Sequence, residues 1–104
     1  MGRLLPVVRH TMIDLFTWGT PVERERRTRI KLCVAAYCYE YLDQPVLTDA
    51  QFDELAALSD PSIVTGRHDD WWRNNFQPFT GSWIHSHPEL AQLGKYARRC
   101  SSVK

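Results

Sequence analysis

The side chains best suited to chemistry are histidines and cysteines, and their spacing argues against both metal binding and nucleophilic catalysis. His85 and His87 would place two imidazoles on one face of a strand, and His68 precedes two aspartates, but no second His-x-His motif or spaced cysteine pair completes a metal site. Cys33 and Cys38 lie in an apolar segment, where a cysteine usually behaves as a small hydrophobic residue. We therefore expect neither a metal site nor a catalytic cysteine.

Charged residues segregate along the chain, although its 104 residues carry a formal net charge of only +1. Residues 1–31 hold seven basic and three acidic groups, residues 40–70 hold eight acidic groups against Arg67 alone, and residues 95–104 hold four basic groups. Two interpretations remain open. Either the basic ends fold against the acidic middle or lie on ordinary solvated faces, or the surface has separate poles that a partner recognises.

Six arginines would form one surface for phosphate groups if the two basic ends converge in space. They are Arg24, Arg26, Arg27, Arg29, Arg98 and Arg99. Such a surface would bind nucleic acid with an affinity that falls with salt. Glu23 and Glu25 interrupt the first group, and the sequence contains no recognition-helix pattern or stacking platform.

A protein partner would instead dock on acidic and aromatic side chains from the middle of the chain. The candidates are Asp43, Glu54, Asp69, Asp70, Trp71 and Trp72. The two tryptophans belong to a dense aromatic group that also contains Phe76, Phe79 and Trp83. Core packing is the alternative role of this group, and an exposed anchor for a partner is the functional one.

Predicted helices position these residues. Thr20, Pro21 and Glu23 form a capping box with proline at the first helical position, which predicts a helix that runs to about Leu42. Apolar residues on two sides of this helix indicate a central element that is covered twice or that leaves one face for a ligand. A second capping box at Thr48 predicts a helix to residues 58–59, and the short connection predicts a helical hairpin over residues 20–59.

The rest of the chain predicts a mainly α-helical single domain. A third helix is expected over residues 67–75, a short two-stranded or irregular segment near residues 76–84, and a last helix from Pro88 to residues 98–99. Residues 1–18 form an N-terminal extension without a clear assignment. The chain has no apolar run of membrane-spanning length, no secretory leader and an odd number of cysteines, so we expect a soluble cytoplasmic protein with no membrane partner.

The segment from Tyr37 to Leu55, which reads YCYEYLDQPVLTDAQFDEL, resembles the N-terminal helical-hairpin domain (Ia) of bacterial NAD-dependent DNA ligases. The family pattern is approximately Y-x-Y-H-x-x-D-x-P-x-x-x-D-x-x-Y-D-x-L, and the spacing matches without a gap. In that family the hairpin recognises the nicotinamide mononucleotide (NMN) half of NAD. The resemblance implies that Tyr39, Asp49 and Asp53 face such a ligand.

Two positions depart from this pattern. Glu40 replaces the histidine and Phe52 replaces the second tyrosine. Losing the imidazole removes a polar contact to the nucleotide, and a carboxylate close to a phosphate is repulsive by about 1 kcal/mol or more.

The chain lacks the parts that DNA ligation requires. A ligase forms its adenylated intermediate on a lysine within a K-x-D-G motif, and this motif is absent here. The lysines are Lys31, Lys95 and Lys104, and the chain is too short for the remaining modules of a ligase. We therefore expect a protein without ligase activity and without a resident cofactor.

The leading hypothesis is a small non-enzymatic binding protein, similar to orphan proteins of phages and prophages, that docks on a host macromolecule in the host cytoplasm. Inhibition of a host defence system such as CRISPR or restriction is one example. One alternative is a protein that binds NMN, NAD or a related nucleotide at the hairpin, through the residues Tyr39, Glu40, Asp49, Phe52 and Asp53. Another alternative is a nucleic-acid-binding accessory protein.

Overall fold

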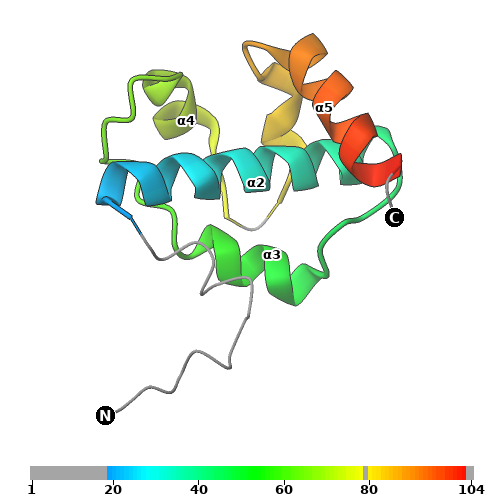
Figure 1. The fold of residues 1–104 in the computed structure, drawn as a ribbon, viewed down its shortest axis with the longest axis horizontal. Coiled ribbons are helices and arrows are strands. Elements are labelled where there is room, and N and C mark those ends of the chain that lie inside the picture. Colours follow the sequence, from blue (N-terminus) through cyan, green and yellow to red (C-terminus); the bar gives the residue numbers. More distant parts are fainter. Residues whose placement is uncertain (1–18, 79, 103–104) are drawn as a thin grey trace.

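The computed structural model describes residues 19–78 and 80–102, and this part of the chain is mainly helical, without a strand. Its elements are α2 (Pro21–Tyr41), α3 (Asp49–Ala56), α4 (Asp69–Asn75), the 3-10 helix η2 (Ser82–Ser86) and α5 (Leu90–Ser102) (Figure 1). The expected N-terminal extension and Phe79 of the aromatic group lie outside the described residues. None of the described helices is both long and apolar enough to cross a membrane.

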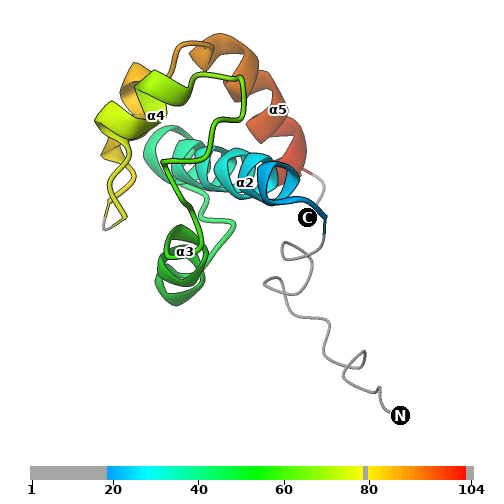
Figure 2. The ribbon, with the colours of Figure 1, turned by 90° about the vertical axis from the view of Figure 1, so that its left-hand side faces the viewer.

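Helix α2 is the central element, as its two-sided apolar pattern predicts. The Thr20 hydroxyl accepts the Glu23 N–H at 3.1 Å, and the Glu23 carboxylate accepts the Thr20 N–H at 2.9 Å, which completes the capping box. The run Leu32–Cys38 is buried all round the helix. Two views explain this burial, because α3 lies on one side of α2 while α4 and α5 lie on the other (Figures 1 and 2).

Helix α3 folds back on α2 and confirms the helical hairpin. Asp43 adopts a left-handed conformation with φ of 51° just after α2 ends, and α3 begins after a second capping box between Thr48 and Gln51. The buried side chains Leu47 and Leu55 join the core beneath α2. The hairpin is therefore fixed by local capping signals and by one apolar face of α3.

The two-stranded alternative near residues 76–84 is wrong. The described residues 76–78, 80 and 81 are irregular, as the other alternative expects, and the 3-10 helix η2 follows from Ser82, with its consecutive residues Trp83 and Ile84 both buried. Neighbouring residues of a strand point to opposite faces, so a strand could not bury both against one core. Helix α5 also differs from expectation, because it begins at Leu90 and continues to Ser102. The His87 ring accepts the Glu89 N–H at 2.9 Å just before this helix.

The aromatic group packs mainly into the core. Trp72 is 2% exposed, stacks on Phe76 with ring centroids 4.2 Å apart, and meets the edge of Trp83 at 5.3 Å. Its indole N–H donates to the Ser59 hydroxyl at 3.1 Å. This cluster anchors α4 and η2 on the face of α2 that lies away from α3.

Candidate functional site

Helices α2 and α3 flank an open pocket of about 340 Å³, which we call the hairpin pocket. Four of the five residues that the ligase resemblance implies line it, namely Tyr39, Asp49, Phe52 and Asp53. Thr80 and Gly81, from the segment before η2, close a third side. The volume lies near the lower end of the range typical of small-molecule sites, about 300–1,000 Å³.

Small residues allow the three walls of the hairpin pocket to approach one another. Ala35 and Ala36 form the α2 wall one turn before Tyr39, and a Cβ added at Gly81 would lie 3.3 Å from the Ala36 Cβ. On α3, Asp49 and Asp53 are four residues apart and so share one face of the helix. The spacing within each helix therefore places these side chains around the same pocket.

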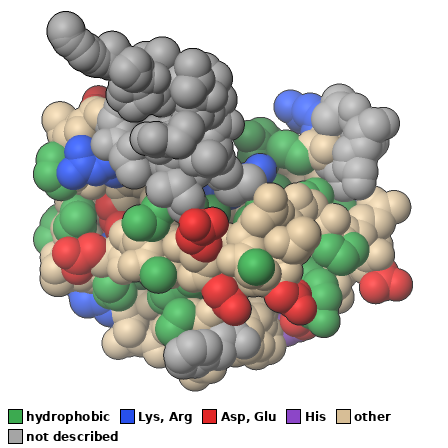
Figure 3. All heavy atoms as spheres, turned by 90° about the horizontal axis from the view of Figure 1, so that it is seen from below, with side chains coloured by type: hydrophobic (Ala, Val, Ile, Leu, Met, Phe, Trp, Pro, Cys, Tyr) green, Lys and Arg blue, Asp and Glu red, His purple; other side chains and the backbone are tan. Residues whose placement is uncertain are grey.

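The hairpin pocket is acidic. Two carboxylates line it, and no lysine, arginine or histidine is among its lining residues in the described part of the chain. Tyr39 is 58% exposed and Phe52 is half-buried, so aromatic surface stands beside the two acids. Seen from the α3 side, acidic side chains are spread among hydrophobic ones (Figure 3). Carboxylates next to aromatic rings favour a cationic group over an anionic one.

Glu40, the fifth residue of the expected site, does not line the pocket and corrects that part of the prediction. Its carboxylate contacts His85 Nε2 at 2.9 Å, and His85 Nδ1 lies 2.6 Å from the Tyr41 hydroxyl. The structure thus brings an imidazole from η2 against the position where the ligase pattern has its histidine. His85 stood out in the sequence only as one half of a His-x-His motif, so its pairing with Glu40 was missed.

The partner-docking candidates divide into exposed and internal residues. Asp43 and Glu54 are exposed on the hairpin, and Asp70 is exposed and paired with Arg73. In contrast, Trp72 lies in the core and Asp69 is turned inward, whereas Trp71 is half-buried. The prediction of Asp69 and Trp72 as surface contacts is therefore wrong, because both hold the fold together.

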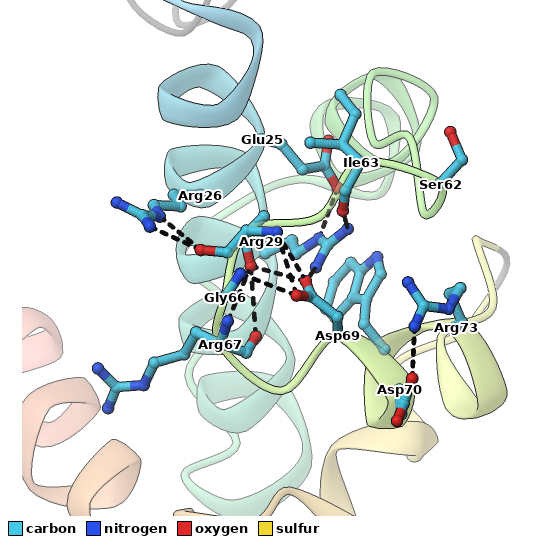
Figure 4. A network of polar contacts seen from close by, with 12 residues as sticks. Glu25, Arg26, Arg29, Ser62, Ile63, Gly66, Arg67, Asp69, Asp70 and Arg73 are labelled. Carbon is cyan, nitrogen blue, oxygen red and sulfur yellow. Dashed lines mark hydrogen bonds and ion pairs between the residues drawn. The ribbon is translucent and has the colours of Figure 1, made fainter.

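A buried ionic network was not expected from the sequence (Figure 4). Arg29, 6% exposed, donates to Glu25 at 2.6 Å and to Asp69 at 2.7 Å. It also donates to the carbonyls of Asp60 and Ile63, at 3.3 and 3.0 Å. The network fastens the loop between α3 and α4 onto α2. The only sequence signal for it is the i,i+4 spacing of Glu25 and Arg29, which does not reveal burial.

The same network sets the ionisation of Asp69. Desolvation acts to raise the pKa of this carboxyl, but hydrogen bonds from Thr65, Gly66 and Arg29 outweigh it and hold the pKa well below its usual range. In the core, burial raises the pKa of the Cys33 thiol to about 12 despite the nearby Arg29. Cys33 and Cys38 are buried, which confirms their role as core residues.

The six basic candidates do not form one surface. Arg24 donates to the Gly19 carbonyl and Arg26 to the Thr65 carbonyl, while Arg29 is buried and must be removed from the expected patch. Arg98 on α5 donates to the Tyr37 hydroxyl at 3.2 Å. The C-terminal end of α5 lies beside the end of α2 that is farther from Pro21 (Figure 1). The remaining two are Arg27, half-buried on α2, and Arg99, exposed on α5. The length of α2 therefore separates the arginines near its start from the two arginines on α5.

No group of three or more histidine, cysteine, aspartate or glutamate side chains is arranged for a metal ion within residues 19–78 and 80–102. His68 and His87 approach each other, with ring centroids 5.6 Å apart, whereas His85 turns toward Glu40 and Tyr41. The three histidines considered from the sequence therefore do not converge.

Comparison of the chain with models of protein families, with curated proteins and with solved structures finds no match. The chemistry of the hairpin pocket and of the surface around it is therefore the basis on which a function is proposed.

Proposed function

We propose that the protein is a non-enzymatic binding protein whose hairpin pocket takes a small ligand with a cationic aromatic ring, of the nicotinamide nucleotide class. One observation carries this proposal. Tyr39, Asp49, Phe52 and Asp53 come from two different helices, yet all four line one pocket of about 340 Å³. The ligase resemblance points to these four positions and to Glu40, and three of the four, Tyr39, Asp49 and Asp53, keep the residue type of the family.

The charge of the pocket favours one end of such a ligand. The nicotinamide ring of NMN and NAD is a pyridinium cation, and Asp49 and Asp53 offer it two carboxylates beside the rings of Tyr39 and Phe52. The phosphate of NMN is repelled by the same carboxylates, so it lies at the rim or outside. The pocket should therefore prefer the cationic ring over the phosphate.

This preference gives a ligand series that tests the proposal. Isothermal titration calorimetry would compare nicotinamide riboside, which has the cation and no phosphate, with NMN, NAD, NADH and neutral nicotinamide. We expect nicotinamide riboside to bind at least as tightly as NMN, and NADH and nicotinamide to bind more weakly because their rings are uncharged. Absence of heat with nicotinamide riboside and NMN at millimolar concentration would exclude the proposal.

A matched pair of variants on α3 locates the binding. Asp53→Ala should weaken nicotinamide riboside binding by about tenfold, since it removes one carboxylate from the pocket. Glu54→Ala removes the same charge from the next residue, which is exposed and does not line the pocket, and should leave affinity unchanged. Equal effects of the two variants would show a general attraction of cations to the acidic surface, not a site.

A second candidate function is docking on a host macromolecule, as phage and prophage proteins that inhibit CRISPR or restriction do in the host cytoplasm. The supporting observation is the exposed acidic surface of the hairpin, where Asp43, Asp49, Asp53 and Glu54 stand without a basic residue between positions 40 and 66. A surface of this kind is complementary to a basic, nucleic-acid-binding partner.

Phage plating on bacteria that carry such a defence system distinguishes this second function. Expression of the protein should restore plating, and Asp43→Lys together with Glu54→Lys should abolish the effect because both side chains are exposed on the hairpin. Tyr39→Ala, which alters the small-ligand site and leaves every acidic side chain of the hairpin in place, should retain it. If expression neither restores plating nor yields a co-purifying host protein, the docking function is excluded.

A further inference from the structure

A second hollow lies on another face of α2, and its chemistry is opposite to that of the hairpin pocket. It has a volume of about 530 Å³ and lies between α2, the segment that leads into α4, α4 itself and α5. We call it the arginine cleft, after the arginines that line it. Residues that matter for its chemistry are Arg26, Ile30, Arg67, Trp71 and Leu93.

One side of the arginine cleft is apolar. Ile30 is 56% exposed, although the helix residues that follow it from Leu32 to Cys38 are all buried. Trp71 and Leu93 line the same cleft from α4 and α5 and are half-buried. The Trp71 indole N–H is already used by the Ser86 hydroxyl at 2.9 Å, so the ring offers only its apolar surface. A ligand with a flat hydrocarbon body would cover these three side chains.

The other side of the arginine cleft is cationic. Figure 4 shows Arg26 and Arg67 extending to the same side of α2, away from the Arg29–Asp69 pair. Arg26 uses Nε and one terminal nitrogen on the Thr65 carbonyl, at 3.1 and 2.6 Å, and its other terminal nitrogen has no partner among the described residues. Arg67 gives one terminal nitrogen to Glu89 at 2.7 Å and leaves two donor groups without a described partner.

Glu89 is the acid among the described residues of this cleft, and it is fully engaged. One of its oxygens is held by Arg67 and the other by His68 Nε2 at 3.1 Å. Arg29 does not add to the free positive charge, since Glu25 and Asp69 neutralise it from behind. The guanidinium donors that remain for an incoming group therefore belong to Arg26 and Arg67, and both are fixed as cations at neutral pH.

We propose that the arginine cleft binds an aromatic organic anion, with its ring on Ile30 and Trp71 and its anionic group on Arg26 and Arg67. A carboxylate, sulfonate or phosphate on an aromatic body all supply this chemistry. The site is independent of the hairpin pocket, which selects the opposite charge.

The fluorescent probe 8-anilinonaphthalene-1-sulfonate, an aromatic sulfonate, tests the proposal on the full chain. We expect saturable binding of one probe per chain. Arg26→Gln and Arg67→Gln should each weaken it about fivefold to tenfold, because each removes a charged donor. Ile30→Glu should abolish it by placing a carboxylate on the apolar wall. Matched controls are Arg73→Gln, whose arginine pairs with Asp70 outside the cleft, and Val64→Glu, whose valine is 69% exposed and does not line it.

Three further measurements separate the outcomes. N-phenyl-1-naphthylamine has the same rings without the sulfonate, and equal affinity for it, unaffected by the arginine substitutions, would overturn the anionic specificity. Circular dichroism establishes that each variant is folded. If Ile30→Glu unfolds, Ile30→Ala should still weaken the probe, and the indole N–H signal of Trp71 should shift on titration while that of the buried Trp83 does not. Binding that does not saturate, or that Val64→Glu reduces as much as Ile30→Ala, excludes the site.

Discussion

Replacement of Glu25 by alanine should be one of the most destabilising single changes in this protein. The Glu25 side chain is 2% exposed and accepts three hydrogen bonds, from Arg29 at 2.6 Å, from the Ser59 hydroxyl at 2.7 Å and from the Asp60 N–H at 2.8 Å. The substitution leaves Arg29 buried with Asp69 as its remaining counter-charge. Removing one partner of a buried ion pair typically costs about 3–5 kcal/mol. Because Asp69 stays in place, we expect the lower end, about 3 kcal/mol.

Urea unfolding followed by tryptophan fluorescence measures this effect. Trp72 lies beneath Arg29, with the guanidinium carbon 5.4 Å from the ring centroid, so one of the four tryptophans that contribute to the emission lies against the network. In thermal unfolding, a loss of about 3 kcal/mol in the free energy of unfolding should lower the unfolding temperature by roughly 12–24 °C in a domain of this size. The slope of unfolding free energy against urea should stay constant, since the surface exposed on unfolding does not change.

Two companion variants serve as controls for the effects of burial and of charge at Glu25. Glu54→Ala removes an exposed carboxylate from α3 and should change the unfolding free energy by less than about 0.5 kcal/mol. Glu25→Gln keeps one oxygen, which can accept the Asp60 N–H, but an amide NH2 replaces the oxygen that accepts from Ser59 and Arg29, so its loss should fall between those of the other two variants. If Glu25→Ala costs less than about 1 kcal/mol, the ion pair is not the buried anchor described above, because Arg29 then reaches water at little cost.

Two other predictions concern acid stability and helix packing. The folded-state pKa of Asp69 lies below its ordinary value of 3.8, so its charged form stabilises the fold above about pH 4, and this contribution is lost as the pH falls further. Asp69→Asn should remove that part of the acid sensitivity, which urea midpoints between about pH 6 and pH 3 would reveal as a flatter profile. On α5, a Cβ at Gly94 would lie 2.5 Å from the Tyr37 hydroxyl, and Tyr37 is only 5% exposed. Gly94→Ala should therefore destabilise by about 1–3 kcal/mol despite its better helix propensity, and Tyr37→Phe in the same chain should recover part of the loss in thermal unfolding.

Local signals predict most of the hairpin. The two threonine capping boxes fix where α2 and α3 begin, and both are complete in the structure. The turn between the helices follows from Asp43 and Pro45, which stop α2 and separate it from α3. In each case the deciding contacts span three or four residues, so the sequence alone contains the information.

The remainder depends on contacts between distant residues, which a single sequence does not display. Residues 82–86 form η2 because Trp83 and Ile84 both reach the core built by α2 and α4, a tertiary requirement that outweighs local strand preference. Arg29 looks like one of several exposed arginines until Asp69, forty positions later, is brought beside it. The partnership of Glu40 with His85 spans forty-five positions and was equally hidden.

The near-neutral net charge conceals two hollows on α2 that carry opposite charges. Among the described residues, the hairpin pocket contains carboxylates and no basic side chain, whereas the arginine cleft presents guanidinium donors that have no partner there. They use different faces of the same helix, with Ala35 and Tyr39 in one and Arg26 and Ile30 in the other. Under the two proposals, a single helix serves two ligands of opposite charge, and the independence of the two sites has a direct consequence. Asp53→Ala should impair nicotinamide riboside and spare the aromatic sulfonate, whereas Arg67→Gln should do the reverse. If Asp53→Ala strengthens the sulfonate as much as it weakens nicotinamide riboside, the hollows act as one electrostatic surface, and neither is a discrete site.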